Sequence, residues 1–273
     1  MPELPEVETV KNELSPHVIG RTVTGVTLFW EGMVHQPSAA EFRSRLVGQR
    51  ITASARRGKY LMFNLASGES LIFHLKMTGS LLLKPLSEDP GRFIQAIIHL
   101  DGNSGIYFRD PRKFGVMWLA KSAASVVRKL GPEPLEDSFT PQLLAQRLAN
   151  RKAPIKALLF DQTFIAGVGN MYADEALFAA RIHPLRPGDS LSPEEIEHLH
   201  HAIQQVLRAA IGNKGASTDT YFRPDGTRGT AHFQFQVAHR RHQNCLVCGG
   251  PLQRITVRNR GSYFCPRCQP EKG

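Results

Sequence analysis

The sequence is poor in cysteine, poorer in acidic than in basic residues, and lacks any long apolar run. No stretch approaches the apolar length that a helix needs to span a bilayer, so we expect no membrane association. The opening MPELPEVETV lacks the basic-then-apolar layout of a secretory signal. The expected compartment is therefore a reducing cytoplasm, where cysteines stay thiols or bind metal. Internal repeats and low-complexity tracts are also absent from the sequence.

The charge balance favours a polyanionic partner. Asp and Glu number 24 against 34 Lys and Arg, which gives a formal net charge of +10 and a pI near 9.7. A basic surface that meets nucleic acid explains this excess, but so does a basic enzyme with scattered solvated charges. With 273 residues, 41% of them hydrophobic, the chain can build one large domain or two compact ones.

The N-terminal half reads as one helix followed by strands. Leu4, Val7, Val10 and Leu14 share a helical face, and Pro16 and Gly20 are expected to end this helix. Short apolar runs separated by turn residues then indicate strands. These runs cover residues 61–65, 71–75, 94–100 and 115–119. We therefore predict a β-sandwich or flattened barrel behind a leading helix.

The second half changes to helical periodicity after a Gly- and Pro-rich linker. Helices are predicted at residues 141–148, 155–161, 171–180 and 193–211. The last has a complete start signal, with Ser192 as N-cap, Pro193 at the first helical position and Glu195 completing a capping box. Gly212 stands where a helix C-cap glycine belongs. Residues 213–243 are polar and non-periodic, which indicates a long functional loop.

All four cysteines lie in two close pairs near the C-terminus. They are Cys245 with Cys248 and Cys265 with Cys268, and sixteen residues separate the pairs. In a reducing compartment this spacing predicts one tetrahedral zinc ion rather than two disulfides. Four thiolates leave no open coordination position, so the metal is structural, and the intervening residues read as a β-hairpin.

The first residues allow an unusual nucleophile. Removal of the initiator methionine would leave Pro2 with a secondary α-amine, which is neutral more often than a lysine at pH 7. Attack on an aldehyde-like sugar carbon would give a cationic iminium, an electron sink. Glu3 and Glu6 are candidate acids beside it. From these residues alone, however, a proline that simply starts a helix is the better interpretation.

Short motifs occur along nearly the full chain. They are Pro2-Glu3-Leu4-Pro5-Glu6-Val7-Glu8-Thr9, Arg57-Gly58-Lys59-Tyr60, His74-Leu75-Lys76-Met77-Thr78-Gly79, Asp110-Pro111-Arg112-Lys113-Phe114-Gly115, Leu130-Gly131-Pro132-Glu133-Pro134-Leu135, Ile165 to Glu175 and the cysteine module. These blocks resemble those of the formamidopyrimidine-DNA glycosylase family, bacterial enzymes that remove oxidised purines. They occur in family order and together are highly specific.

The resemblance implies a bifunctional DNA glycosylase and abasic-site lyase with named catalytic residues. Pro2 would attack C1′ of the damaged nucleotide, and Glu3 would assist opening of the sugar ring. Lys59 matches a lysine assigned to proton transfer, and Arg260 matches an arginine that grips a flanking phosphate. The iminium would then permit β- and δ-elimination. Without the resemblance, Lys59 would read as a solvated turn lysine.

The same resemblance implies a set of DNA contacts. Because a base inside a duplex cannot be reached, the enzyme would evert it and fill the hole with Met77, Arg112 and Phe114. Without the resemblance, Met77 and Phe114 would be interpreted as ordinary core residues at strand ends. Phosphate contacts are implied for a further group, in which Arg92 stands where the family usually has a histidine. This group is Arg92, Arg151, Lys156 and Asn170.

The loop after residue 213 departs from the family pattern. Gly215 to Pro224 and Val237 to Arg240 differ from the sequence that usually lies over the everted base. Because that loop helps to choose the lesion, a preference for 8-oxoguanine is less secure than glycosylase activity itself. The opposite-base preference also stays open.

The predicted architecture is α+β with four parts. Residues 1–130 form a catalytic β-sandwich with its leading helix, and residues 131–139 form a linker. Residues 140–243 form a helix–two-turn–helix domain with a lesion-capping loop at 213–235, and residues 244–273 form the zinc finger. We expect a monomer that acts on damaged double-stranded DNA in the bacterial cytoplasm and associates with the nucleoid when bound. Two alternatives are a catalytically silent DNA-binding protein on this scaffold and a zinc-ribbon protein that binds RNA.

Overall fold

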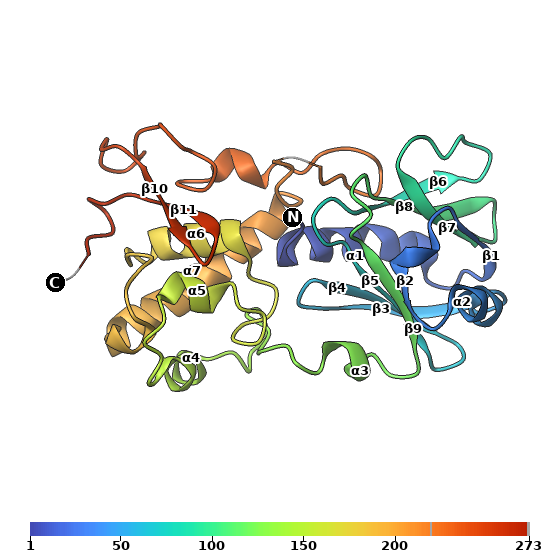
Figure 1. The fold of residues 1–273 in the computed structure, drawn as a ribbon, viewed down its shortest axis with the longest axis horizontal. Helices are drawn as coiled ribbons and strands as arrows, with labels where there is room; N and C mark the ends of the chain where they lie inside the picture. The colour runs from blue at the N-terminus through green and yellow to red at the C-terminus, as the bar shows by residue number, and fades with distance from the viewer. Residues whose placement is uncertain (219, 272–273) are drawn as a thin grey trace. The chain divides into compact units, whose positions relative to one another are not determined.

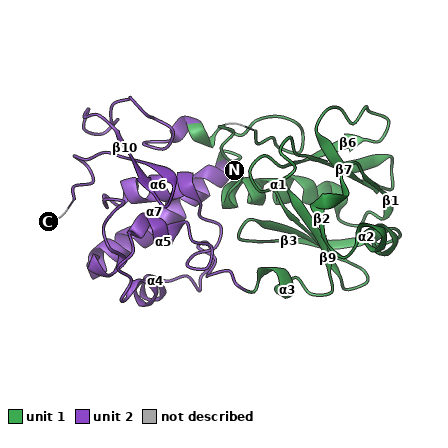
Figure 2. Ribbon diagram, viewed as in Figure 1, with its two compact units in different colours: residues 1–128, 213–232 green, residues 129–212, 233–273 purple. Residues whose placement is uncertain are grey.

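The structure is a computed structural model that describes residues 1–218 and 220–271. Asp219, in the predicted capping loop, and the last two residues of the predicted zinc finger lie outside the described residues. The chain forms two compact units (Figure 2). Unit 1 comprises residues 1–128 and 213–232, and unit 2 comprises residues 129–212 and 233–273. Residues 213–232, assigned from sequence to the helical domain, thus group with unit 1 by their contacts.

Unit 1 contains two antiparallel-rich sheets and short helices (Figure 1). One sheet has the strand order β1-β7-β8-β6 and the other β2-β9-β5-β4-β3. The elements are α1 (Leu4–Val18), β1 (Val23–Leu28), η1 (Glu31–Met33), β2 (Val34–Gln36), α2 (Ala39–Leu46), β3 (Ile51–Arg57), β4 (Tyr60–Leu65), β5 (Ser70–His74), β6 (Ser80–Pro85), β7 (Ile94–Leu100), β8 (Ser104–Arg109), β9 (Val116–Ala120) and α3 (Ala124–Val127). The predicted β-sandwich with a leading helix is confirmed.

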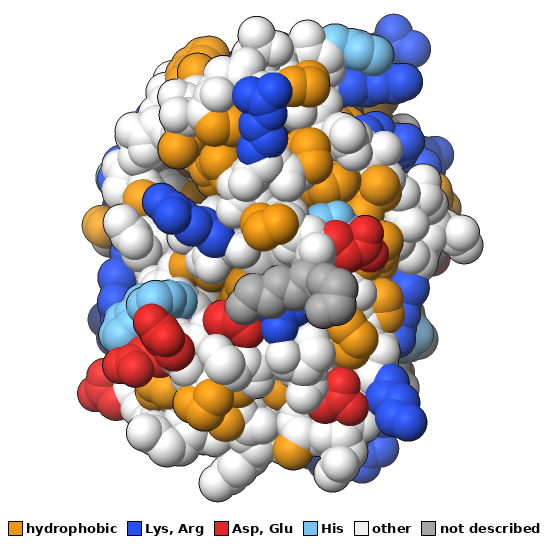
Figure 3. Space-filling view, turned by 90° about the vertical axis from the view of Figure 1, so that its left-hand side faces the viewer, with side chains coloured by type: hydrophobic (Ala, Val, Ile, Leu, Met, Phe, Trp, Pro, Cys, Tyr) orange, Lys and Arg blue, Asp and Glu red, His pale blue; other side chains and the backbone are white. Residues whose placement is uncertain are grey.

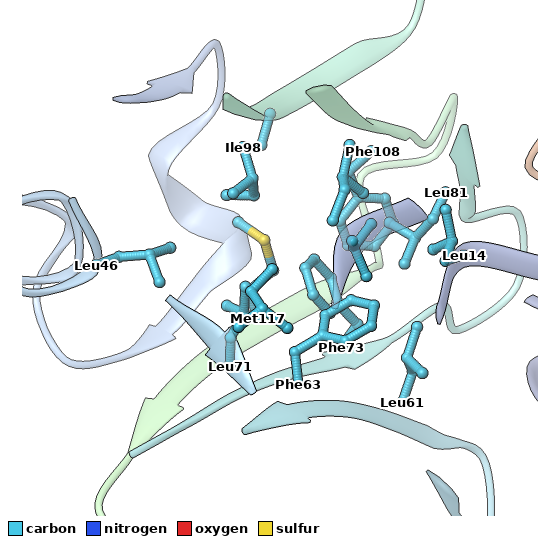
Figure 4. Packing of buried hydrophobic residues seen from close by; sticks show 14 of the residues in the cluster. Leu14, Leu46, Leu61, Phe63, Leu71, Phe73, Leu81, Ile98, Phe108 and Met117 are labelled. Atoms are coloured by element: carbon cyan, nitrogen blue, oxygen red, sulfur yellow. The ribbon is translucent and has the colours of Figure 1, made fainter. Parts of the chain in front are cut away.

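The core of unit 1 lies between the two sheets and is closed by α1 and α2 (Figure 4). Phe63 and Phe73 from one sheet and Phe108 from the other meet edge to face, with ring centroids about 6 Å apart. Leu14 of α1 and Leu46 of α2 are fully buried in the same cluster. The apolar face of α1 that the sequence predicted is therefore the face that packs on the sheets.

Helix α1 does not end at Pro16 as predicted. It continues to Val18 and ends at Ile19, and Gly20 follows with φ +86°. A proline in the last turn costs a helix the bond from one N–H group, and packing of the buried Val18 holds the final turn in place. The glycine, which relieves the left-handed backbone, marks the true end.

Unit 2 is helical and carries a terminal β-hairpin. Its elements are α4 (Pro141–Leu148), α5 (Ile155–Leu159), α6 (Asn170–Ala179), η2 (Gly188–Ser190), α7 (Pro193–Gly212), β10 (Gln253–Val257) and β11 (Arg260–Phe264), while η3 (Ala231–Gln234) straddles the boundary between the units. The capping box of α7 is confirmed, because Glu195 N–H donates to Ser192 Oγ at 3.2 Å and Ser192 N–H to Glu195 Oε2 at 2.9 Å.

Helix α6 is buried over most of its surface and organises unit 2. It packs against α5, α7 and β11, so that the hairpin and the helices share one framework. Phe178 of α6 joins Val237, Leu252 and two of the cysteines in a second apolar cluster. Among the described residues, no helix combines the length and apolar character required to cross a membrane.

Candidate active site and nucleic-acid interface

The start of the chain is fixed by a capping box at the N-terminus of α1. Glu3 is the N-cap residue, and its side chain and that of Glu6 each accept from the other's backbone N–H. The bond from Glu3 N–H to Glu6 Oε2 is 2.7 Å long. Pro2 immediately precedes this cap and is buried, whereas Met1 is 41% exposed. The sequence therefore places Pro2 at the positive end of a helix dipole, beside two buried carboxylates.

The loop over residues 213–232 is anchored on α1. Glu6 Oε1 accepts from Ala216 N–H at 2.7 Å, and Tyr221 is buried in the unit 1 core. Burial raises the pKa of Tyr221 well above its usual value, and the charges of Glu6 and Glu13 raise it further. Arg223 reaches Glu13 with two guanidinium nitrogens, at 2.7 and 3.1 Å. Tyr221 and Arg223 thus attach this loop to the first helix.

Lys59 lies in the tight turn between β3 and β4. Gly58 takes the positive φ of +56° that such hairpin turns require at this position. Lys59 is only 4% exposed, unlike an ordinary solvated turn lysine. Burial lowers the pKa of the nearby His74 to about 3, and the charges of Lys76 and Lys59 add to this effect. Lys59 is therefore held next to an imidazole that stays neutral.

The three void-filling candidates lie on two loops of unit 1 and reach the surface. Phe114 is 48% exposed, Arg112 is exposed, and Met77 is half-buried. The guanidinium of Arg112 lies over the Phe114 ring, 4.5 Å from its centroid. The exposure of Phe114 contradicts its interpretation as a core residue. Arg92 is exposed as well, over the ring of Phe93 at 4.6 Å.

The polar candidates of unit 2 lie before α5, within α5 and at the start of α6. Asn170 is the first residue of α6, and its Nδ2 donates to the Gly261 carbonyl of the hairpin at 2.8 Å. Lys156 is fully buried, with Nζ 2.5 Å from both Asp174 Oδ1 and the Asn170 carbonyl. Its ammonium thus braces Asn170 from inside the unit, and a direct phosphate contact stays a prediction. Arg151 is exposed.

The four cysteines converge on one point. Their Sγ atoms all lie within 4.8 Å of one another, with 3.8 Å between Cys245 and Cys268 and 3.4 Å between Cys248 and Cys265. A tetrahedron of thiolates at a zinc–sulfur distance of about 2.3 Å has sulfur–sulfur edges of about 3.8 Å. The donor set and its spacing therefore fit a structural zinc ion.

The hairpin between the two cysteine pairs presents arginine side chains. Arg258 and Asn259, with φ +44° and +60°, form its two-residue turn, and the exposed Arg260 begins β11. Ser262, two residues further on, donates to Asp174 Oδ1 at 2.6 Å. Strand β11 is thus fixed to helix α6 two residues after Arg260.

Three buried acids escaped the sequence analysis. Asp174 binds Lys156 and Ser262, and Asp110 binds residues of two loops. Glu175 accepts from the backbone N–H groups of residues 236, 237 and 238 at 2.8–2.9 Å. Two adjacent acids within the apolar helix 170–179 were an available signal, because a buried charge needs a partner. Their partners are distant in sequence and could not be named from it.

Positive charge forms no continuous patch on the face drawn in Figure 3. Basic and acidic side chains both occur there, with hydrophobic and uncharged groups between them, and many of the basic ones lie toward the edges of the view.

Comparison with protein families assigns consecutive parts of the chain. Residues 1–117 match the formamidopyrimidine-DNA glycosylase N-terminal domain, and residues 130–221 match the H2TH domain of the same enzymes. Residues 243–270 match a zinc finger found in FPG and IleRS. A formamidopyrimidine-DNA glycosylase of Chloroflexus aurantiacus is 47% identical over 272 residues, covering 98% of each chain. This chain belongs to the formamidopyrimidine-DNA glycosylase family. It is accordingly an enzyme, a DNA glycosylase. Its zinc finger binds one zinc ion through the four cysteines.

Solved structures of this family have the same fold. The FPG protein of Thermus thermophilus is 38% identical, with a TM-score of 0.89 and full coverage of both chains. A mutant Lactococcus lactis FPG bound to Fapy-dG-containing DNA gives a TM-score of 0.93 at 33% identity, covering 99% of this chain and 100% of that one. The helix–two-turn–helix domain and hairpin zinc finger of the expected α+β fold are thus confirmed.

Proposed function

We propose that this enzyme excises oxidised purines, formamidopyrimidines and 8-oxoguanine, from duplex DNA and then cuts the strand by β,δ-elimination. Family membership supports the substrate class, because solved relatives are bound to DNA with Fapy-dG or an abasic site. The observation that carries the chemistry is the position of Pro2, directly before the capped N-terminus of α1. We expect a monomer that works in the bacterial cytoplasm, on the nucleoid.

The Pro2 amine is the proposed nucleophile once Met1 has been removed. An α-amino group titrates near pH 8, and the positive end of α1 favours the neutral, nucleophilic form. The capping box between Glu3 and Glu6 fixes the backbone that carries this amine. The attacking nitrogen is therefore held in place before substrate binds, which lowers the entropic part of the barrier.

The proposed reaction begins with a displacement at C1′ of the damaged nucleotide. The Pro2 nitrogen forms a bond to C1′ while the glycosidic bond breaks, and the base leaves with the bonding electrons and takes up a proton. The nitrogen of the adduct then loses its N–H proton, Glu3 donates a proton to O4′, and the ring opens as the nitrogen lone pair forms a cationic iminium. Loss of a C2′ proton expels the 3′ phosphate, and loss of a C4′ proton expels the 5′ phosphate. Water then hydrolyses the iminium, which frees Pro2 and leaves a one-nucleotide gap with phosphates on both sides.

Other side chains take supporting roles in the proposal. Lys59, beside the neutral His74, transfers a proton near the reacting nucleotide, and Glu6 is a further candidate acid. Arg260 grips a flanking phosphate, and Arg92, Arg151, Lys156 and Asn170 are the remaining candidates for phosphate contacts. Zinc, when bound, supplies structure rather than chemistry, because four thiolates leave it no free position.

Base eversion is assigned to Met77, Arg112 and Phe114. The exposed Phe114 and the half-buried Met77 replace lost stacking, while Arg112 bonds the orphaned partner base. The loop at 213–235 covers the everted base and selects the lesion. Because Tyr221 and Arg223 tie this loop to α1, lesion choice is coupled to the helix that carries the nucleophile.

A panel of duplexes, each with one defined lesion, tests the proposal. Wild type should release formamidopyrimidine and 8-oxoguanine and nick the strand, and Pro2→Gly should lower excision roughly a hundredfold or more. Pro5→Ala, a second proline of the same helix start, is the matched control and should retain activity. Binding of lesion duplexes by wild type without any base release would instead favour the catalytically silent alternative.

A further inference from the structure

One buried carboxylate lies where the two void-filling loops meet. Met77 is in the turn between β5 and β6, and Arg112 and Phe114 are in the connection between β8 and β9. Asp110 begins that connection and is fully buried in unit 1. A buried carboxylate is costly unless donors surround it, so the identity of its donors shows what it holds in place.

The donors to Asp110 come from both loops. Its Oδ1 accepts from the Thr78 hydroxyl, next to Met77, and from Arg112 N–H at 3.2 Å. Its Oδ2 accepts from Gly115 N–H, next to Phe114, at 2.6 Å. One carboxylate thus bonds to Arg112 itself and to the immediate neighbour of each of the other two void-filling residues.

The two loops also pack against one aromatic ring. A Cβ added at Gly79 would lie 2.9 Å from Phe108 Cε2, and one added at Gly115 would lie 2.5 Å from Phe108 Cζ. Phe108 itself is fixed in the core of unit 1 (Figure 4). Lys76 and Lys113, beside the void-filling residues, hold the left-handed φ values of +52° and +58°. Both loops therefore pack closely on the same fixed ring.

Fixed geometry matters for the task proposed for these loops. Unstacking a base step has a free-energy cost that the inserted side chains must recover. Side chains and loops that order only on binding would spend part of the gain on lost entropy. A pair of loops already joined in the free protein avoids this loss.

We propose that Asp110 is a positioning residue that locks the Met77 loop to the Arg112–Phe114 loop, so that the three side chains enter the duplex as one rigid wedge. The inference rests on the proposed function, because it assumes that these loops enter DNA. Asp110 itself touches no reacting atom and acts through Thr78, Arg112 and Gly115. Its loss should therefore impair filling of the duplex while leaving the chemistry of Pro2 intact.

The sharpest variants are Asp110→Asn and Thr78→Val. Asparagine keeps the shape of Asp110 but turns one acceptor oxygen into an NH₂ group, which cannot accept from a backbone N–H. Thr78→Val removes only the bond between the loops. Thr52→Val is the control for the substitution itself, because it loses an exposed hydroxyl bond, to the Asn64 carbonyl at 3.1 Å, outside both loops.

Two readouts separate wedge insertion from chemistry. The first is base excision from a lesion duplex with 2-aminopurine opposite the lesion, whose fluorescence reports unstacking of the orphaned base. The second is borohydride trapping on a single-stranded abasic oligonucleotide, which has no stack to fill and no partner base. We expect both variants to lose at least roughly tenfold in excision and most of the fluorescence change, with trapping within about twofold of wild type.

The outcomes are distinct. Wild-type excision and fluorescence in both variants would overturn the inference, as would an equal loss of trapping and excision, which would show a general structural defect. Equal effects of Thr52→Val and Thr78→Val would also overturn it. No trapped adduct from wild type would sink the proposed function instead, and thereby identify which of the two claims had failed.

Discussion

Glu6 and Ala216 are joined by a 2.7 Å hydrogen bond, although they lie 210 positions apart in the chain. The backbone N–H of Ala216 donates to one oxygen of the buried Glu6 carboxylate, and the other oxygen accepts from Glu3 N–H. The residue after the proposed nucleophile and the proposed lesion-selecting loop therefore depend on the same side chain. A substitution at Glu6 should therefore affect both the backbone at Glu3 and the loop at Ala216.

Glu6→Gln should loosen the loop at its attachment. Glutamine offers one acceptor oxygen for two N–H donors, so one of the bonds must be lost, at a cost of about 1–3 kcal/mol. Amide hydrogen exchange of peptides covering residues 213–218 should become faster, and excision should fall. Glu8→Gln is the control, because this α1 carboxylate pairs with Lys11 and Arg56, which lie outside the loop. Unchanged exchange at Ala216 would contradict the account.

Zinc removal should abolish DNA binding without unfolding unit 1. The cysteines belong to the apolar cluster that includes Phe178 of α6, so loss of the ion disrupts the hairpin that presents Arg260. Both tryptophans, Trp30 and Trp118, lie in unit 1, and their fluorescence should show an unchanged melting transition after chelation. Retained DNA binding by protein that metal analysis shows to be zinc-free would refute this role.

Unit 1 should lose stability in mild acid through His74. Its pKa is lowered to about 3 from the ordinary 6.5, so the unfolded chain binds a proton between these values that the folded unit does not. The contribution is fully present above pH 6.5 and is lost as the pH falls toward 3. At about pH 5 the loss should approach about 2 kcal/mol.

His74→Asn isolates this contribution. The amide oxygen of asparagine can replace Nδ1 as acceptor for Lys76 N–H, which now donates at 3.0 Å, but it does not titrate. Denaturation followed by tryptophan fluorescence at about pH 7.5 and about pH 5 should show a smaller acid-induced loss in the variant. Parallel losses in the two proteins would show that another group is responsible.

Lys156 and Asp174 should behave as a buried pair in which each needs the other. Burial raises the pKa of Asp174, and the charge of Lys156 partly opposes this shift. Lys156→Met would leave the buried Asp174 carboxylate without its cation and should destabilise unit 2 by about 3–5 kcal/mol. The double variant with Asp174→Leu should recover much of this loss. The exposed neighbour Lys152→Met is the control, and far-ultraviolet circular dichroism on heating is the measurement. A double variant no more stable than Lys156→Met would contradict the pairing.

Helices and strands that depend on signals from neighbouring residues could be predicted from the sequence. The helix over residues 193–212 is indicated by Ser192, Pro193 and Glu195, and the structure has these bonds. Helix α2 was missed although Ser38 and Glu41 form the same box, because its eight residues are too short to show a clear period. Strand β3 was missed because most of its side chains are only half-buried, which hides the alternation of a strand.

The candidate site likewise contains residues that the sequence indicated and contacts that only the structure shows. Only the family resemblance singled out Pro2 and Lys59, whose roles stay predictions, whereas spacing alone predicted the cysteine cluster; the structure adds that Lys59 is buried and that the sulfurs meet at one point. Local motifs could not show that Asp110 joins two loops or that Tyr221 anchors a loop on α1, because these contacts link distant segments. Phe114 had to be seen exposed before a core role could be excluded.

The identity of the nucleophile is tested most directly by mapping a trapped adduct. Wild-type enzyme is reacted with an abasic duplex in the presence of borohydride, digested with protease and nuclease, and analysed by tandem mass spectrometry. The account predicts a reduced sugar remnant on the α-nitrogen of Pro2, in chains that lack Met1. An adduct on Lys59 or another lysine, or full activity in protein that retains Met1 on every molecule, would contradict it.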